Sequence, residues 1–177
     1  MNNTFFAYLQ QLEMMAFFSA YPLVYAIMNV IFGNSKKEII RKFPTLLPYA
    51  YALVGLLFFG LQLKNFYPNY SIEYIKSEIQ QPLLYIWALL SILFFIPALA
   101  KKPVLSLLHS LVFFFFLLRD IFSPLFTTTT DKNILRNEMK VYTDSLLINL
   151  GAFSFIALLF FLFILYKKRK NSRASNY

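Results

Sequence analysis

The stretch Val104–Phe122, VLSLLHSLVFFFFLLRDIF, decides the fold class. No Asp, Glu, Lys or Arg precedes Arg119 in it, and Phe113–Phe116 is an unbroken run of phenylalanine. A strand of a membrane barrel would alternate apolar and polar residues, and this stretch does not. A helix needs about 20 apolar residues to cross a hydrocarbon core of about 30 Å. The stretch therefore predicts a transmembrane helix.

Four further stretches have similar length and apolar character: Met14–Phe32, Thr45–Leu63, Leu83–Ala100 and Leu146–Tyr166. Backbone polar groups have no water partners inside lipid, so each stretch should be helical. We therefore predict an all-α integral membrane protein, a bundle of about five transmembrane helices forming one membrane domain over residues 1–177. Pro22, Pro48 and Pro97 predict local kinks, and Lys101-Lys102-Pro103 predicts a tight hairpin.

The composition agrees with a lipid-embedded chain. Hydrophobic residues make up 59% and charged residues 14%, against about 45–50% and about 25% in a typical soluble domain. The net charge of +9 is gathered in short clusters between apolar runs, which argues against a nucleic-acid partner. Because the chain has no Cys, thiolate metal sites, a Cys nucleophile and disulfides are excluded.

The distribution of Lys and Arg predicts the orientation, because cytoplasmic loops carry the excess. With the N-terminus outside, the cytoplasmic segments hold Lys36, Lys37, Arg41, Lys42, Lys101, Lys102, Lys167, Lys168, Arg169, Lys170 and Arg173. The outer segments hold Lys64, Lys76, Arg119, Lys132, Arg136 and Lys140. We therefore expect five crossings with a cytoplasmic C-terminus. The main competitor has four crossings, with Val104–Phe122 only dipping into the membrane.

The segments between the spans carry weaker signals. Apolar residues recur at helical spacing in Tyr70–Gln80 and in Asp131–Asp144, which predicts two short amphipathic helices on the outer leaflet. The segment Lys167–Tyr177 is basic and polar, so it is expected to be a cytoplasmic tail without regular structure. In the last span, Asn149, Gly151 and Ser154 are small or polar enough for close helix packing.

His109 is the first candidate for a functional residue, because it is an ionisable group within a predicted span. Its unperturbed pKa of about 6.5 suits proton transfer, but a hydrogen bond between helices is the more ordinary role. About 16 Å of helix separates His109 from Asp120, so the two should not act as a pair. A single His excludes a bis-histidine haem or a His-cluster metal site within one subunit.

A second candidate is a layer of charges at the outer ends of three spans, formed by Glu13, Arg119, Asp120 and Asp144. It could be a charged vestibule for a substrate, or an interfacial network in which Arg119 reaches toward the headgroups. Because Arg119 and Asp120 are adjacent on a helix, the partner of Arg119 is expected on another helix.

A third candidate is a polar stripe along the first span. Gln11 and Asn29 mark the two ends of a helical face that also includes Met15, Phe18, Pro22 and Tyr25. This face could line a cavity, or it could pack against neighbouring helices with Gln11 and Asn29 as hydrogen-bonding residues.

No catalytic motif, metal-binding motif or cofactor motif is present in the sequence. We therefore expect no catalytic residues and no cofactor. The favoured function is an accessory or scaffold subunit of a membrane complex, with lipid, other membrane subunits or further copies of the chain as partners. The alternative is a small transporter or channel-like protein using the span-one stripe and His109, and an enzyme acting on lipid comes third. The residue usage suggests a bacterial inner membrane.

Overall fold

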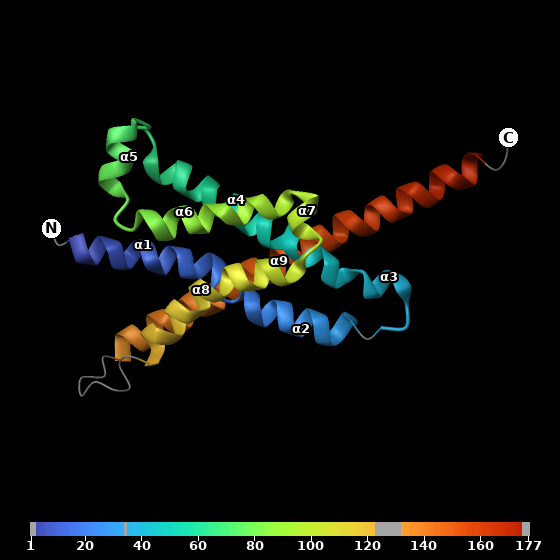
Figure 1. The fold of residues 1–177 in the computed structure, drawn as a ribbon, viewed down its shortest axis with the longest axis horizontal. Helices are drawn as coiled ribbons and strands as arrows, with labels where there is room; N and C mark the ends of the chain where they lie inside the picture. The colour runs from blue at the N-terminus through green and yellow to red at the C-terminus, as the bar shows by residue number, and fades with distance from the viewer. Residues whose placement is uncertain (1–2, 34, 123–131, 175–177) are drawn as a thin grey trace.

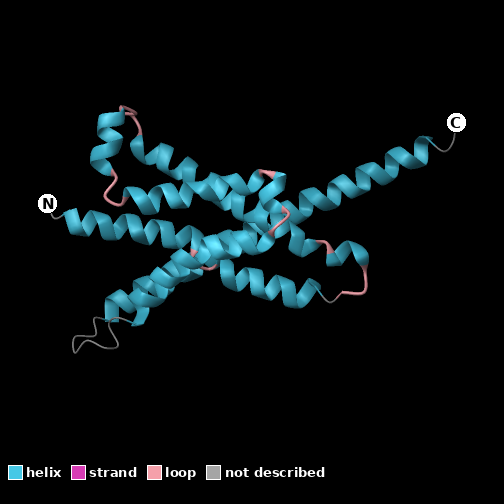
Figure 2. Ribbon diagram, in the orientation of Figure 1, coloured by secondary structure: helices cyan, strands magenta, loops and turns pink. Residues whose placement is uncertain are grey.

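A computed structural model describes residues 3–33, 35–122 and 132–174. Within these ranges all regular structure is helical (Figure 2). Four helical segments are long and apolar enough to cross a membrane, and the bent segment formed by Ile72–Glu78 and Pro82–Phe95 makes a fifth if it is counted as one span. The prediction of an all-α protein with several helices long and apolar enough to cross a membrane is therefore confirmed.

The chain runs back and forth between two ends of the molecule (Figure 1). It follows the order α1 (Asn3–Phe18), α2 (Tyr21–Gly33), α3 (Glu38–Arg41), η1 (Phe43–Leu46), α4 (Leu47–Phe66), α5 (Ile72–Glu78), α6 (Pro82–Leu90), η2 (Ser91–Phe95), α7 (Pro97–Ala100), α8 (Pro103–Phe122) and α9 (Lys132–Ala174). The N-terminus and α5 lie at one end, which we call the α5 end. Helices α3 and α7 lie toward the other, which we call the α3 end.

The first predicted span lies within one candidate span, Phe6–Gly33, which is interrupted near Pro22 where a local kink was predicted. Pro22 has no N–H to donate to the Phe18 carbonyl, so the α-helical ladder cannot continue through this point. Accordingly α1 ends at Phe18 and α2 begins at Tyr21. Ser19 and Ala20, between the helices, are both fully buried. Irregular backbone at membrane depth is tolerated where protein covers it, and here it is covered.

Helix α9 supplies hydrogen bonds to the backbone at this break. The Ala20 N–H donates to Ser145 Oγ at 3.0 Å. Asn149 Nδ2 donates to the Phe17 carbonyl at 2.7 Å and to the Ser145 carbonyl at 2.8 Å. Ser145 and Asn149, one turn apart on α9, therefore bond to one backbone N–H and one backbone carbonyl beside the break. We call this set of contacts the α9 clamp.

The third predicted span, Leu83–Ala100, is also not one continuous helix. Pro97 disfavours helical geometry at Ile96, whose φ and ψ are −71° and 122°. The chain therefore passes from α6 into the 3₁₀ segment η2 and restarts as α7. Gly55 of α4 allows η2 to approach closely, since a Cβ at Gly55 would lie 2.0 Å from Ser91 Oγ.

Two predictions about the last span are wrong. The segment Asp131–Asp144 does not form a separate surface helix, because α9 runs without a break from Lys132 (Asp131 lies outside the described residues). The tail from Lys167 is likewise helical as far as Ala174, and residues 175–177 are outside the described ranges. A helix of 43 residues is about 65 Å long, roughly twice the thickness of the hydrocarbon core.

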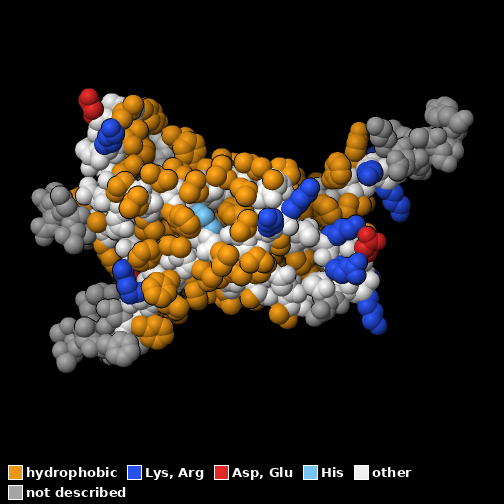
Figure 3. All heavy atoms as spheres, viewed as in Figure 1, with side chains coloured by type: hydrophobic (Ala, Val, Ile, Leu, Met, Phe, Trp, Pro, Cys, Tyr) orange, Lys and Arg blue, Asp and Glu red, His pale blue; other side chains and the backbone are white. Residues whose placement is uncertain are grey.

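Other connections follow the prediction. The helix expected within Tyr70–Gln80 is present as α5, and Ser71 Oγ accepts a capping hydrogen bond from the Tyr74 N–H at 3.3 Å. The tight hairpin is present too, because α7 ends at Ala100 and α8 begins at Pro103. On the face shown in Figure 3, hydrophobic side chains cover the middle and many Lys and Arg side chains lie toward the α3 end.

The core is dominated by aromatic side chains from α1, α2, α4 and α8. Phe18 lies at its centre, with ring centroids 4.9 Å from Phe113, 5.5 Å from Phe58 and 5.7 Å from Tyr51. All four side chains are fully buried. Burial is uneven across the spans: 56% of the most apolar window of the α4 segment is buried, against 17% in α9.

The α9 clamp gives a first prediction. Asn149→Ala leaves the Phe17 carbonyl without its side-chain partner and should lower the free energy of unfolding by about 1–2 kcal/mol, the upper range for such bonds in membranes. Thr143→Ala is the matched control, because the exposed Thr143 hydroxyl bonds only to the Met139 carbonyl of the same helix. It should cost less than about 0.5 kcal/mol. Equal losses in detergent unfolding experiments would show that the clamp contributes nothing specific.

Candidate functional site

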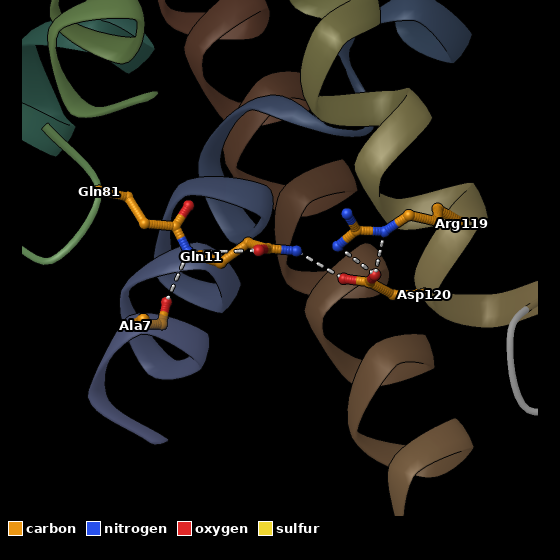
Figure 4. Close-up of polar contacts among 5 residues, drawn as sticks. All are labelled: Ala7, Gln11, Gln81, Arg119 and Asp120. Carbon is orange, nitrogen blue, oxygen red and sulfur yellow. Dashed lines mark hydrogen bonds and ion pairs between the residues drawn. The ribbon is translucent and has the colours of Figure 1, made fainter. Parts of the chain in front are cut away.

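Polar side chains gather at two levels of the bundle. The first lies at the α5 end, where α1, α8 and the start of α6 meet. Gln11 of α1 donates from Nε2 to Asp120 Oδ2 of α8 at 2.7 Å. The Gln81 amide donates to the Ala7 carbonyl at 3.2 Å and to Gln11 Oε1 at 3.5 Å. Figure 4 shows Gln11 between Gln81 and Asp120, so one glutamine joins three elements.

Arg119 completes this level from the same helix as Asp120. Its Nε and a terminal nitrogen donate to Asp120 Oδ1 at 2.9 and 2.8 Å (Figure 4). The guanidinium also lies 5.0 Å from the Phe116 ring centroid. The Arg119 side chain is 53% exposed and that of Asp120 is 12% exposed. Among the described residues, Arg119 pairs with its neighbour Asp120 and not with another helix, because the long side chain folds back, so the expected partner on another helix is not found there.

Among the described residues, the four charges expected to meet in one layer do not form a common ion-pair network. Glu13 turns toward α4, where Glu13 Oε2 accepts a hydrogen bond from Gln62 Nε2 at 3.2 Å. Asp144 is half-buried on α9. Within the described residues, neither carboxylate forms an ion pair with Arg119. Over the part of the chain that the structure describes, the interfacial network therefore consists of the Arg119–Asp120 ion pair and the hydrogen bond from Gln11 to Asp120.

The second level surrounds His109 in the middle of the bundle. His109 Nδ1 and the Tyr51 hydroxyl are 2.8 Å apart, and the side chain is 9% exposed. The Trp87 ring stacks on the imidazole with centroids 4.7 Å apart and planes 6° from parallel. Trp87 Nε1 also donates to the His109 carbonyl at 3.1 Å. His109 thus joins α8 to α4 and α6.

A ring contact connects this cluster to α2, which makes a polar contact of its own with α8. The rings of Tyr51 and Tyr21 lie 4.3 Å apart, and the Tyr21 hydroxyl is 2.7 Å from Ser106 Oγ. His109 Nε2 is buried, and no described residue forms a hydrogen bond with it. The other residues of the cluster form polar contacts with residues of other helices. The cluster therefore resembles a structural cross-link in which His109 Nε2 is still able to donate or accept a hydrogen bond.

The span-one stripe is largely packed. Met15 and Phe18 are fully buried in the core. Asn29 donates to the Tyr25 carbonyl of its own helix at 2.8 Å, so it does not link helices there. Gln11 does link helices, and it is the member of the stripe that joins the polar level at the α5 end.

The structure contains polar contacts that sequence reasoning did not assign. Ser145, the residue just before the predicted last span, lies one helical turn from Asn149, and that spacing was a readable signal. Asn149 packs closely against α1, in line with its predicted packing role, whereas Gly151 and Ser154 are exposed and do not. Trp87, the single tryptophan, could have been suspected from its rarity. The described residues include no group of three or more His, Cys, Asp or Glu side chains arranged to hold a metal ion.

A double-mutant experiment tests the pairing at the α5 end. Arg119→Leu should lower the free energy of unfolding by about 1–3 kcal/mol, between the ranges for exposed and buried pairs, because it leaves a mostly covered Asp120 carboxylate without its cation. Adding Asp120→Asn should recover part of the loss, since Asn can still accept from Gln11. Adding Glu13→Gln should recover nothing. Recovery with Glu13→Gln instead would mean that the pairing crosses helices.

Comparison with known proteins adds no further constraint. No protein-family model, no curated protein and no solved structure matches this chain. Its function has to be inferred from the geometry described above.

Proposed function

We propose that this chain is a five-span plasma-membrane protein that serves as a non-enzymatic accessory or scaffold subunit of a membrane complex. In this proposal the N-terminus is outside, the C-terminus is cytoplasmic, and the host membrane is a bacterial inner membrane. Helix α9 is the main surface for the partner.

The positions of the basic clusters support the orientation. The clusters around α3, after α7 and at the C-terminal end of α9 belong to segments near the α3 end (Figures 1 and 3). Clustered Lys and Arg favour the cytoplasmic side. For these clusters to share one side, an even number of crossings must separate each cluster from the next. With the N-terminus on the opposite side, the total number of crossings is then odd. The broken segment α6–η2–α7 then counts as a crossing.

The uneven burial of the spans is the observation that carries the scaffold role. Helix α9 is the most apolar candidate span, with a mean hydropathy of 2.5, yet only 17% of its window is buried. Phe155, Phe161 and Phe163 are each more than half exposed. Lipid can cover such a surface, but aromatic side chains packed against another helix gain dispersion contacts and shape-specific packing. The interior, in contrast, is filled by side chains that contact one another.

A small transporter is the second candidate. Two observations favour it: the unpartnered His109 Nε2 in the middle of the bundle, and a polar cavity of about 180 Å³ at the α5 end. His109 does not line that cavity. In a transporter, a rearrangement of the aromatic core would have to connect His109 with this cavity.

Photo-crosslinking separates the two functions. A crosslinking amino acid at Phe163 of α9, 64% exposed, should form a one-to-one adduct with a distinct membrane protein in native membranes. Phe115 of α8, 69% exposed, is the matched control and should react with lipid only. Lipid adducts alone at both sites would contradict the scaffold role. A proton flux by the purified protein in vesicles, lost in His109→Ala, would favour the transporter.

A further inference from the structure

A cavity of about 180 Å³ lies at the α5 end, between α1, the end of α4 and the end of α5. Its walls combine two aromatic rings, one leucine and five polar side chains: Phe6, Leu9, Gln10, Glu13, Gln62, Asn65, Phe66 and Glu78. The described residues that line it include two carboxylates and no Lys, Arg or His. The charge of the lining is therefore negative and has no counter-charge within the cavity.

The amide donors of the lining are directed to protein acceptors. Gln62 Nε2 donates to Glu13 Oε2 at 3.2 Å, and Asn65 Nδ2 donates to Gln62 Oε1 at 3.5 Å. Gln10 Nε2 donates to the Glu78 backbone carbonyl at 2.6 Å. Each of these bonds uses one of the two N–H groups of its amide, and two amide oxygens also accept: Gln10 Oε1 from the Gln80 N–H at 2.9 Å, and Gln62 Oε1 from Asn65. The remaining acceptors, chiefly the carboxylate oxygens, outnumber the remaining N–H groups, which favours a ligand that donates hydrogen bonds.

Both carboxylates, Glu13 and Glu78, can still pair with a cation and accept further hydrogen bonds. In the described part of the chain neither Glu13 nor Glu78 forms an ion pair. A carboxylate has two oxygens that each accept hydrogen bonds, and Glu13 uses one of them for Gln62. A positively charged donor would therefore find charge and free acceptors together.

The side chain of Tyr85 packs against the cavity lining. Tyr85 is 5% exposed, and its hydroxyl has no hydrogen-bond partner among the described residues. Its ring packs on Phe66 of the cavity lining with centroids 6.5 Å apart. A buried hydroxyl is normally satisfied by a partner, so a ligand that reached it from the cavity would gain a hydrogen bond.

We propose that this cavity binds a primary ammonium group, carried by a lipid headgroup or by a small soluble amine. An ammonium offers three N–H donors and one positive charge to the Glu13 and Glu78 carboxylates. The Phe66 ring supplies surface for a cation and for the carbon attached to it. The volume suits a small group rather than a whole lipid. The proposal does not depend on the identity of any protein partner.

The test uses the full chain in phosphatidylcholine nanodiscs, whose headgroups carry no N–H. Ethylammonium is the probe, and its binding is followed by ligand-observed NMR. A ligand of three heavy atoms reaches at best a Kd on the order of 1 mM. Glu13→Gln and Glu78→Gln should each weaken binding at least tenfold. Glu73→Gln, on the exposed side of α5 and outside the cavity lining, should leave binding unchanged.

Two further arms complete the test. Tetramethylammonium has the charge but no N–H group, so it should bind at least tenfold more weakly than ethylammonium. In phosphatidylethanolamine nanodiscs, an apparent Kd raised at least tenfold identifies the lipid headgroup as the ligand, and an unchanged Kd identifies a soluble amine. The proposal is overturned by the absence of saturable binding, by wild-type affinity in both glutamine variants, or by equal affinity for tetramethylammonium. Glutamine preserves the acceptor for Gln62, so folding of Glu13→Gln is expected to be intact.

Discussion

Everything in this bundle depends on how the backbone around Ser19–Ala20 is hydrogen-bonded. In lipid there is no water to accept or donate at a helix break, so protein groups must do so. The Ala20 N–H bonds to Ser145, and the Phe17 carbonyl bonds to Asn149. These contacts require α9 to lie directly against the junction of α1 and α2. A helix far away in the sequence is thereby fixed beside the first span.

The aromatic core follows from this placement. Phe18, the last residue of α1, has three aromatic neighbours from α4 and α8. Individual hydrogen bonds between helices in membranes contribute only about 0.6 kcal/mol on average. The close packing of large rings therefore has to provide much of the stability, and the polar levels at Gln11 and His109 fix which faces meet. This division explains why so few polar residues suffice in a chain with 59% hydrophobic residues.

The sequence was informative where one physical rule acted alone. Apolar length identified the spans, and proline placed the start of α8 at Pro103. It was less informative where several rules act together. Pro22 indicated a kink, but the hydrogen bonds that satisfy the interrupted backbone come from Ser145 and Asn149, far away in the sequence. We did not predict that α9 continues through Asp144. A surface helix and the extension of a membrane span show the same periodic pattern of polar and apolar residues, so the pattern does not distinguish them. The Arg119 and Asp120 contact was missed because side-chain spacing on an ideal helix ignores how far arginine can fold back.

The claim that the chain passes five times through the membrane is tested most directly by single cysteines in this cysteine-free protein. At Lys36, Lys102 and Lys168, all exposed and near the α3 end, cysteines should be shielded from a membrane-impermeant thiol reagent in intact cells. At Ser77 and Lys140, toward the α5 end, they should react. Reaction at Lys168 together with shielding at Lys36 would require an even number of crossings and would contradict the five-span architecture.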